Sequence, residues 1–239
     1  MSGHSKWSTI KRKKGAADAK RGVIFTRLSK DISLAARQGG GDIDMNPSLR
    51  LAVKKAKAAN MPSANIERAI KKGTGDLPGV KFEDFEYEGY GPHSVAILIE
   101  IMTDNKNRTL PEIRSIMTKN GGNLGESGCV NWMFERKGIV SVKSSEITED
   151  SLMNILDDVD IEDINIDDDF YEIITKPEDF QEINSLFEKN GIQFEGEVSL
   201  VPQSLIQLSL DEADKVVKLL ELIENHDDVQ KVHTNFEVV

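Results

Sequence analysis

Basic residues at the start of the chain are the ones whose type and spacing indicate a chemistry. All four residues from Lys11 to Lys14 (KRKK) are basic, and the stretch from Lys6 to Arg21 contains seven basic residues against one acid, Asp18. Such a cluster repels itself and cannot build a core, whereas it binds a polyanion well. Trp7 adds a flat ring on which a base can stack. The stretch therefore predicts a nucleic-acid-binding arm; the alternative is a disordered tail that only keeps the chain soluble.

The net charge divides the chain into two parts of opposite sign. Residues 1–72 contain 17 Lys and Arg against 5 Asp and Glu, a net charge of +12. Residues 73–239 contain 13 against 36, a net charge of −23, and the whole chain carries −11. A split of this kind indicates that the basic part binds a polyanion, while the acidic remainder keeps the chain off other nucleic-acid surfaces.

Composition argues against several classes of protein. No run approaches the ~20 apolar residues of a membrane-spanning helix, and the N-terminus lacks the apolar segment of a signal peptide. The single cysteine, Cys129, allows no internal disulfide and fits a reducing compartment. One Cys and four scattered His argue against a zinc site. We therefore expect a cytoplasmic protein with no metal, no cofactor, no membrane partner and no small-molecule substrate.

The residues that follow the arm must position it, and they are predicted to form three short helices. Apolar residues recur at helical spacing from Gly22 to Gln38, and three glycines then end this helix. The pair Asn46-Pro47 is typical of a helix start, and Asn60 to Pro62 breaks the second helix. The third helix is expected to end at Gly73. Together they predict a basic helical domain over residues 1–75.

Each of these helices has basic residues on the side away from its apolar positions. Exposed lysines often contact only solvent, but an excess of one sign on all three helices favours phosphate binding. The predicted nucleic-acid-binding residues are Lys6, Trp7, Lys11, Arg12, Lys13, Lys14, Lys20, Arg21, Arg27, Lys30, Arg37, Arg50, Lys54 and Lys57.

After a linker at 73–79 the pattern becomes that of an α+β protein. Thr109 and Glu112 have the spacing of a capping box, which predicts a helix that ends at Asn120-Gly121. Further helices are expected to start after Thr148, at Pro177 and after Asp211. Strands are predicted at 82–91, 95–102, 130–134, 139–142, 170–175, 198–201, 205–210 and 232–238.

The order of strand, helix and strand repeats along this part of the chain. It predicts an α+β fold in which an N-terminal three-helix bundle with a basic arm is followed by two ferredoxin-like α+β sandwich domains. Since the strands at 95–134 need completing, we expect the end of the chain to return to them. The expected domains are 1–75, 76–137 together with 205–239, and 138–204 as a domain inserted into the second.

Three further motifs indicate structural roles. The acidic run 157–169 aligns poorly with a calcium loop, because Asp168 stands where the loop needs Gly, so we expect a solvated loop and strand edge. The glycine-rich loop 121–128 follows a helix and lacks the Lys-Ser/Thr ending of a P-loop, which favours a tight turn. Cys129 is expected to be a small buried residue. No catalytic constellation is predicted, and hence no enzyme.

Several of these segments also resemble a known family. The chain resembles the YebC family in six segments, which occur in this order: GHSKWSTIKRKKGAADAKRG, NMPSANIERAIKKGTG, YEGYGP, TDNKNRT, GGNLGESG and MFERKG. That family comprises YebC/PmpR probable transcriptional regulators and mitochondrial activators of translation. The resemblance runs from Gly3 to about Gly138. It implies an N-terminal helical domain, two α+β domains with the third inserted into the second, and no enzyme activity.

The basic N-terminal part and the family resemblance together predict a nucleic-acid-binding regulator of gene expression, with either DNA or ribosomal RNA as partner. A basic arm without a recognisable recognition helix suits backbone binding better than the reading of an operator, which favours a translation factor that binds ribosomal RNA. The alternatives are a sequence-specific DNA-binding transcriptional regulator and an acidic protein-interaction module with an incidental basic tail.

Overall fold

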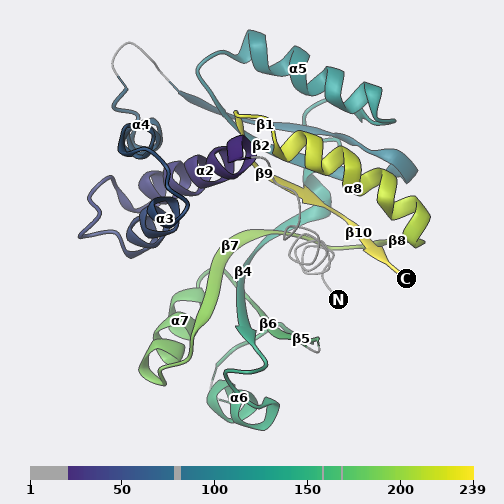
Figure 1. Ribbon diagram of the computed structural model, residues 1–239. Helices are drawn as coiled ribbons and strands as arrows, with labels where there is room; N and C mark the ends of the chain where they lie inside the picture. The colour runs from purple at the N-terminus through teal and green to yellow at the C-terminus, as the bar shows by residue number, and fades with distance from the viewer. Residues whose placement is uncertain (1–20, 78–81, 158, 168) are drawn as a thin grey trace. The chain divides into compact units, whose positions relative to one another are not determined.

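The structure is a computed structural model that describes residues 21–77, 82–157, 159–167 and 169–239 (Figure 1). The predicted arm residues up to Lys20 lie outside the described residues, and for Arg21 and Arg27 only the backbone is described. The described residues form two compact units. The larger unit contains residues 21–131, 208–232 and Val239, and the smaller unit contains residues 132–207 and 233–238.

Three helices form the first part of the larger unit: α2 (Arg21–Gly39), α3 (Pro47–Ala58) and α4 (Ser63–Thr74) (Figure 1). Their apolar faces meet in one core that includes Ile32, Leu49 and Ile66. The start of α3 is confirmed, since the Asn46 side chain accepts a hydrogen bond from the Leu49 N–H at 3.0 Å. Its amide also donates to the backbone carbonyls of Ala35 and Gly40, which holds the α2–α3 loop against the helix that precedes it.

The end of α4 differs from the prediction, because the helix continues through Gly73 and ends before Gly75. Gly75 has a left-handed backbone with φ of 78°, the conformation in which glycine commonly ends a helix. Gly73 serves a different purpose. A Cβ at this position would lie 2.2 Å from the Ser33 carbonyl oxygen, so the glycine allows α4 to approach the backbone of α2.

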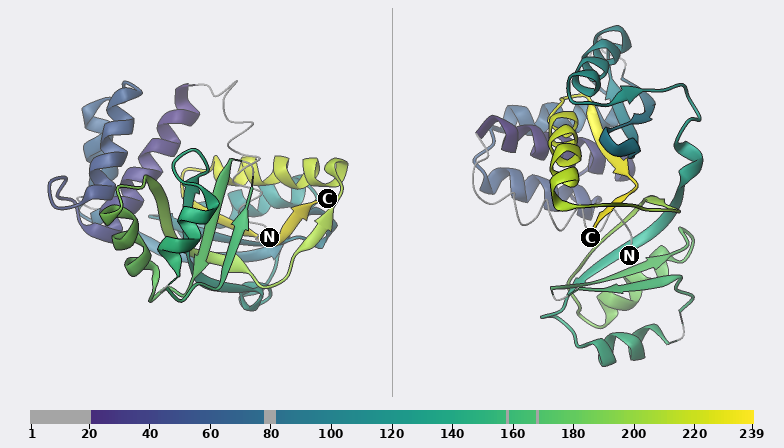
Figure 2. Two further views of the ribbon diagram at one scale, coloured as in Figure 1. Left: turned by 90° about the horizontal axis from the view of Figure 1, so that it is seen from below. Right: turned by 90° about the vertical axis from the view of Figure 1, so that its right-hand side faces the viewer.

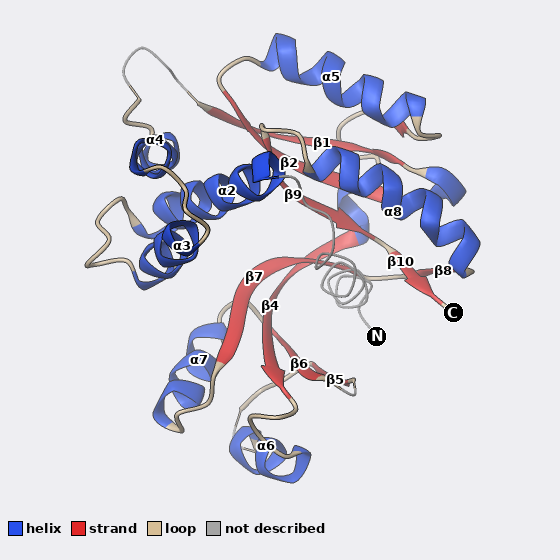
Figure 3. Cartoon of the chain, in the orientation of Figure 1, coloured by secondary structure: helices blue, strands red, loops and turns tan. Residues whose placement is uncertain are grey.

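The sheet of the larger unit has the strand order β3-β1-β2-β9. Its strands are β1 (Glu83–Tyr90), β2 (Ala96–Thr103), β3 (Asn123–Leu124) and β9 (Val229–Thr234). The apolar strand β2 lies inside the sheet with seven of its eight residues buried. The helices α5 (Lys106–Lys119) and α8 (Leu210–Glu224) contact each other and bury their apolar residues in the same unit (Figure 3).

Two predicted helix caps in this unit are wrong. The helix α5 begins one turn earlier than expected, because Asn105 rather than Thr109 caps it by accepting from the Arg108 N–H. Thr109 is instead fully buried. At α8 the capping box is formed by Ser209 and Glu212, not by Asp211. The predicted stop of α5 at Asn120-Gly121 is confirmed.

The predicted strand at 130–134 is also wrong. Residues Asn131–Met133 form a short 3-10 turn, η2, and the strand β4 begins only at Phe134. The backbone N–H groups of Val130 and Asn131 both donate to the Glu88 carboxylate, so they are not available for a ladder. A second 3-10 turn, η1 (Pro92–Ser94), joins β1 to β2.

The smaller unit contains a four-stranded antiparallel sheet with the order β5-β6-β4-β7 (green in Figure 2). Its elements follow one another as β4 (Phe134–Lys143), α6 (Glu149–Leu156), β5 (Asp163–Ile166), β6 (Phe170–Thr175), α7 (Phe180–Lys189) and β7 (Phe194–Pro202). This is the chain order of a ferredoxin-like sandwich. Leu152 and Phe187 from the two helices share one core with Val140 and Ile173 from the strands.

Of the features predicted from local sequence in the smaller unit, some are confirmed and one is wrong. Thr148 caps α6 as predicted, by accepting from the Ser151 N–H. Pro177 does not open α7, which begins at Phe180 with Asp179 at its N-cap. The acidic run contains the strand β5, which pairs with β6 alone and lies at the edge of the sheet, in agreement with the prediction of a strand edge.

The last strands form a small two-stranded sheet of β8 (Ile206–Leu208) and β10 (Phe236–Val238). The prediction placed one continuous strand at 232–238, but β9 and β10 are separated at Asn235. The α+β class with antiparallel sheets and an N-terminal helical region is confirmed. Within the described part of the chain, no helix is long and apolar enough to cross a membrane.

Candidate nucleic-acid interface and the adjoining pocket

Two of the predicted phosphate-binding residues are presented by α3. Lys54 and Lys57 are exposed on the side of the helix opposite its buried residues, and Lys55 is exposed beside them. None of the three forms an ion pair with a residue in the described ranges. Their ammonium groups are therefore available to an anionic partner.

Three other predicted residues contact the protein itself. The Lys30 ammonium donates to the carbonyl of Glu224 at the C-terminal end of α8. The guanidinium of Arg37 binds both carboxylate oxygens of Asp84 in β1, in the fork-to-fork geometry that arginine favours. Arg50 donates to two backbone carbonyls of the α2–α3 loop. These side chains hold the unit together in this structure, so they differ from the lysines of α3.

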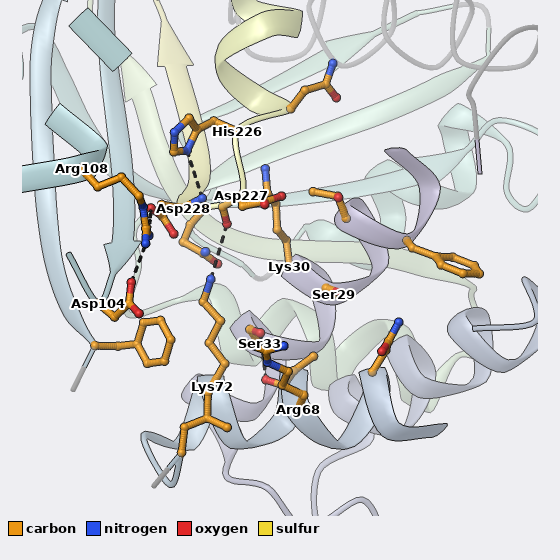
Figure 4. A pocket seen from close by; sticks show the side chains of 18 of the residues that line it. Ser29, Lys30, Ser33, Arg68, Lys72, Asp104, Arg108, His226, Asp227 and Asp228 are labelled. Carbon is orange, nitrogen blue, oxygen red and sulfur yellow. Dashed lines mark hydrogen bonds and ion pairs between the residues drawn. The ribbon is translucent and has the colours of Figure 1, made fainter. Parts of the chain in front are cut away.

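A pocket of about 870 Å³ lies where α2 and α4 face the N-terminal end of α5 and the turn between α8 and β9 (Figure 4). Its charged lining residues are Lys30, Arg68, Lys72, Asp104, Arg108, Glu112, Asp227 and Asp228, together with His226. Apart from Lys30, none of these was among the predicted site residues. Four cations and four carboxylates are thus gathered around one cavity.

Asp228 is the centre of a hydrogen-bond network on one wall of this pocket. Its Oδ2 accepts from the hydroxyls of Thr109 at 2.7 Å and Thr103 at 3.1 Å, and from the Arg108 guanidinium at 2.8 Å. Burial alone would raise the pKa of the Asp228 carboxyl. The three donors outweigh it and hold the pKa below its ordinary value, so the network fixes an ionised carboxylate.

The same wall contains a histidine whose ring is held on both sides. The His226 Nδ1 accepts from the backbone N–H of Asp228 at 3.1 Å, which assigns the proton of the neutral ring to Nε2. This Nε2–H donates to the Glu112 carboxylate at 2.9 Å. Arg108 additionally binds Asp104 at 3.0 Å. Of the four carboxylates that line the pocket, Asp227 has no side-chain partner among the described residues.

Lys72 extends from α4 toward this acidic wall (Figure 4). Its ammonium lies 3.5 Å from the Asp227 carbonyl oxygen and 5.1 Å from the centroid of the Phe82 ring. Burial lowers the pKa of Lys72, while the carboxylates of Asp228, Asp227 and Asp104 act in the opposite direction.

The glycine-rich loop after α5 is a tight structure organised by Glu88. This buried carboxylate accepts three backbone N–H groups, from Gly128 at 2.6 Å and from Val130 and Asn131 at 2.8 Å. Burial would raise the pKa of Glu88, but the three N–H groups together lower it. A Cβ on Gly89 would lie 2.2 Å from the Asn123 carbonyl oxygen. The loop is therefore a pinned turn, as predicted, and not a phosphate cradle.

Cys129 lies in this loop. It is partly buried, and burial together with the Glu88 carboxylate raises the pKa of its thiol. A raised pKa makes a thiol a poor nucleophile at neutral pH. No cluster of three or more His, Cys, Asp and Glu in the described ranges is arranged to hold a metal ion.

Comparison with known proteins identifies the family. Residues 5–76 match the TACO1/YebC protein N-terminal domain, and residues 82–236 match the TACO1/YebC second and third domain. The chain belongs to the TACO1/YebC family. The TACO1/YebC segment TDNKNRT forms the Asp228 network, since it contains Thr103, Asp104, Arg108 and Thr109.

Relatives in the TACO1/YebC family cover the whole chain. A protein of Desulforapulum autotrophicum is 54% identical over 239 residues, which is 100% of this chain and 97% of the relative. A protein of Dictyoglomus turgidum is 52% identical over 240 residues, 100% of this chain and 96% of the relative. Both are named probable transcriptional regulatory protein.

A solved structure of the same fold is the crystal structure of a conserved hypothetical protein, Aq1575, from Aquifex aeolicus. It is 44% identical in sequence and superposes with a TM-score of 0.76, covering 95% of this chain and 94% of its own.

Proposed function

We infer that this TACO1/YebC protein is a non-enzymatic regulator of gene expression that binds the phosphate backbone of nucleic acid. The observation that carries the inference is the row of exposed lysines on α3, Lys54, Lys55 and Lys57, which have no carboxylate partner in the described ranges. The sequence before α2 is also rich in basic residues, with seven between Lys6 and Arg21. Such contacts supply affinity that is independent of sequence.

We favour ribosomal RNA as the partner. Reading a DNA operator requires side chains held at base edges, each bidentate pair contributing roughly 1–3 kcal/mol of discrimination. Arginine is the residue best suited to such pairs, yet Arg37 and Arg50 bind Asp84 and backbone carbonyls here. The lysines of α3 are point charges suited to phosphate. A ribosome-acting factor takes its specificity from a preformed site, which the acidic domains proposed at 76–137 with 205–239 and at 138–204 would recognise by shape.

Operator DNA is the second candidate, because the relatives are named probable transcriptional regulatory proteins. The two candidates differ in what competes for binding. If RNA is the target, random duplex should displace a promoter fragment nearly as well as the promoter itself, and the protein should cosediment with ribosomes.

The deciding experiment compares the whole protein with a variant in which Lys11, Arg12, Lys13 and Lys14 are all replaced by Ala. We expect ribosome cosedimentation to be lost in the variant while its thermal stability is unchanged. A promoter preferred about a thousandfold over random duplex at physiological salt, without ribosome association, would establish the operator-binding function instead.

A further inference from the structure

The two halves of α3 present different surfaces to solvent. The C-terminal half carries the row of exposed lysines on which the proposed function rests. The N-terminal half has one cation, Arg50, and its guanidinium donates to the backbone carbonyls of Ile43 and Asp44. The loop before the helix also contains two exposed carboxylates, those of Asp42 and Asp44. Phosphates are therefore attracted to the C-terminal half of α3 and not to its N-terminal half.

Leu51 is a large apolar residue that this N-terminal half leaves in solvent. It is 54% exposed, although Leu49 in the same turn is fully buried in the core of the three helices. Residues three and four positions apart share one face of a helix, so Leu51 lies on the face of Lys54 and Lys55. The helix contains no acidic residue. An apolar side chain thus adjoins two cations that have no carboxylate partner within the described part of the chain.

Met45 is held outward at the same end of the helix. It is 80% exposed, whereas Ile43 of the same loop packs against the core. Both of its neighbours in sequence are fixed, since the Asp44 carbonyl accepts from Arg50 and the Asn46 amide donates to two backbone carbonyls. The loop therefore presents Met45 to solvent from a rigid support. Two large apolar side chains at one end of a helix, with cations beside them, indicate a surface that a partner covers.

We propose that Met45 and Leu51 contact unpaired bases of the RNA whose phosphates the lysines of α3 bind. This inference rests on the proposed function and adds the feature of the RNA that the helix recognises. In a continuous duplex the bases are stacked inside, and a helix surface meets sugars and phosphates, whereas an unpaired base exposes an apolar face. Leucine and methionine are among the apolar side chains that proteins insert against bases. An RNA bulge therefore suits both halves of α3, and a perfect duplex suits only the lysines.

Fluorescence anisotropy with the whole protein tests this proposal by the direction in which one substitution changes affinity. The probes are a labelled RNA hairpin with an unpaired bulge and the same hairpin fully paired. We expect the bulged hairpin to bind about tenfold tighter. The variant Leu51→Lys adds a cation beside the lysines but removes the apolar contact. It should therefore bind the bulged hairpin more weakly and lose the preference for it, while binding of the paired hairpin should not weaken.

Ala58→Lys is the matched control. Ala58 is exposed on the same face of α3, about two turns after Leu51, and has no large apolar side chain to lose. Its added cation should tighten the binding of both hairpins. Leu51→Met should keep the preference for the bulge, and Met45→Gln should reduce it. Because all three positions are exposed, the thermal midpoints of these variants should match that of the unchanged protein, which excludes a merely structural effect.

A basic helix with exposed apolar residues also suits an anionic membrane surface, and vesicles of equal parts phosphatidylserine and phosphatidylcholine test that partner. Vesicle binding that is lost in Leu51→Lys would overturn the proposal in favour of lipid. Equal affinity for the two hairpins would overturn it too, as would unchanged or tighter binding of the bulged hairpin by Leu51→Lys. Failure of the proposed function gives a different result, since neither hairpin would then bind.

Discussion

Arg108 and Asp228 are separated by 120 residues in sequence and lie 2.8 Å apart, so that one ion pair joins the first turn of α5 to the start of β9. The pair is flanked by the hydroxyls of Thr103 and Thr109, both buried. Removing the carboxylate takes from each of these donors its bond to Asp228. The network should therefore determine how firmly β9 is fixed to the rest of the sheet.

We predict that Asp228→Asn lowers the free energy of unfolding by roughly 2–3 kcal/mol, because a neutral amide is a weaker acceptor for the three donors and Arg108 keeps only its ion pair with Asp104. Urea denaturation measures the change. Asp227→Asn, one residue away and exposed, is the matched control and should stay within about 0.5 kcal/mol. If both variants lose the same free energy of unfolding, the hydrogen bonds to Asp228 do not stabilise the fold.

Glu88→Gln is predicted to destabilise the larger unit by a similar amount. The glutamine amide would direct its NH2 at backbone N–H groups of Gly128 or of Val130 and Asn131, which are donors themselves. The same change at Glu86, exposed on the same strand, serves as the control. Thermal unfolding of the two variants should differ clearly; coincident melting curves would contradict the pinned-turn interpretation.

Stability should decline in acid for a reason that these two carboxyls share. Folding lowers the pKa of both Asp228 and Glu88, so the unfolded chain takes up protons first as the pH falls. Their contribution is fully present above the ordinary carboxyl pKa values of about 4 and is lost as the pH falls through the lower folded values. Denaturation curves measured between roughly pH 7 and pH 3 should show this decline, and it should be smaller in Asp228→Asn.

Gly73→Ala should destabilise the helical part even though alanine is the better helix former. The added Cβ would lie 2.2 Å from the Ser33 carbonyl oxygen, and a backbone atom in a packed helix cannot move aside cheaply. We expect a loss of roughly 1–3 kcal/mol, which exceeds the gain of about 1 kcal/mol in helix propensity. Lys71→Ala, on an exposed position of the same helix, is the control. A stabilised Gly73→Ala protein would refute the close approach.

The lysines of α3 should contribute to the salt dependence of nucleic-acid binding. Replacing Lys54 and Lys57 by Gln is predicted to reduce the slope of log affinity against log salt by about 1.4 on single-stranded RNA, if each lysine contacts one phosphate. The control replaces Lys215 and Lys218 of the acidic helix α8 in the same way. Identical slopes in both double variants would remove α3 from the interface.

Local signals predicted much of this fold. The cap at Asn46 and the cap at Thr148 depend on residues within one turn, and the apolar spacing of α2, α3 and α4 predicted their common core. Thr109 was assigned wrongly, because its hydroxyl bonds to Asp228, 119 residues away. The strand expected at 130–134 failed for a related reason, since Glu88 of another strand takes its backbone donors.

The pocket could not be predicted, because its lining comes from separate segments of the chain that no spacing rule connects. Its one sequence signal was TDNKNRT, in which an Asp, an Arg and two Thr occur together at the end of an apolar strand. The sequence predicted Lys30 and Arg37 to lie on one basic side of α2. What the sequence did not indicate is that this side contacts Glu224 and Asp84.

Because Arg37 forms an ion pair with Asp84, a nucleic acid that approaches this side of α2 must compete with Asp84 for the Arg37 guanidinium. A phosphate that takes the Arg37 guanidinium must displace the Asp84 carboxylate, so the strand β1 and a nucleic acid are rival ligands of one side chain. Linkage is reciprocal: whatever tightens α2 against β1 weakens polyanion binding there, and a bound polyanion loosens α2 by the same free energy. An anion therefore binds Arg37 only if its affinity for the guanidinium exceeds that of the Asp84 carboxylate, and α2 is released from β1 only when such an anion binds.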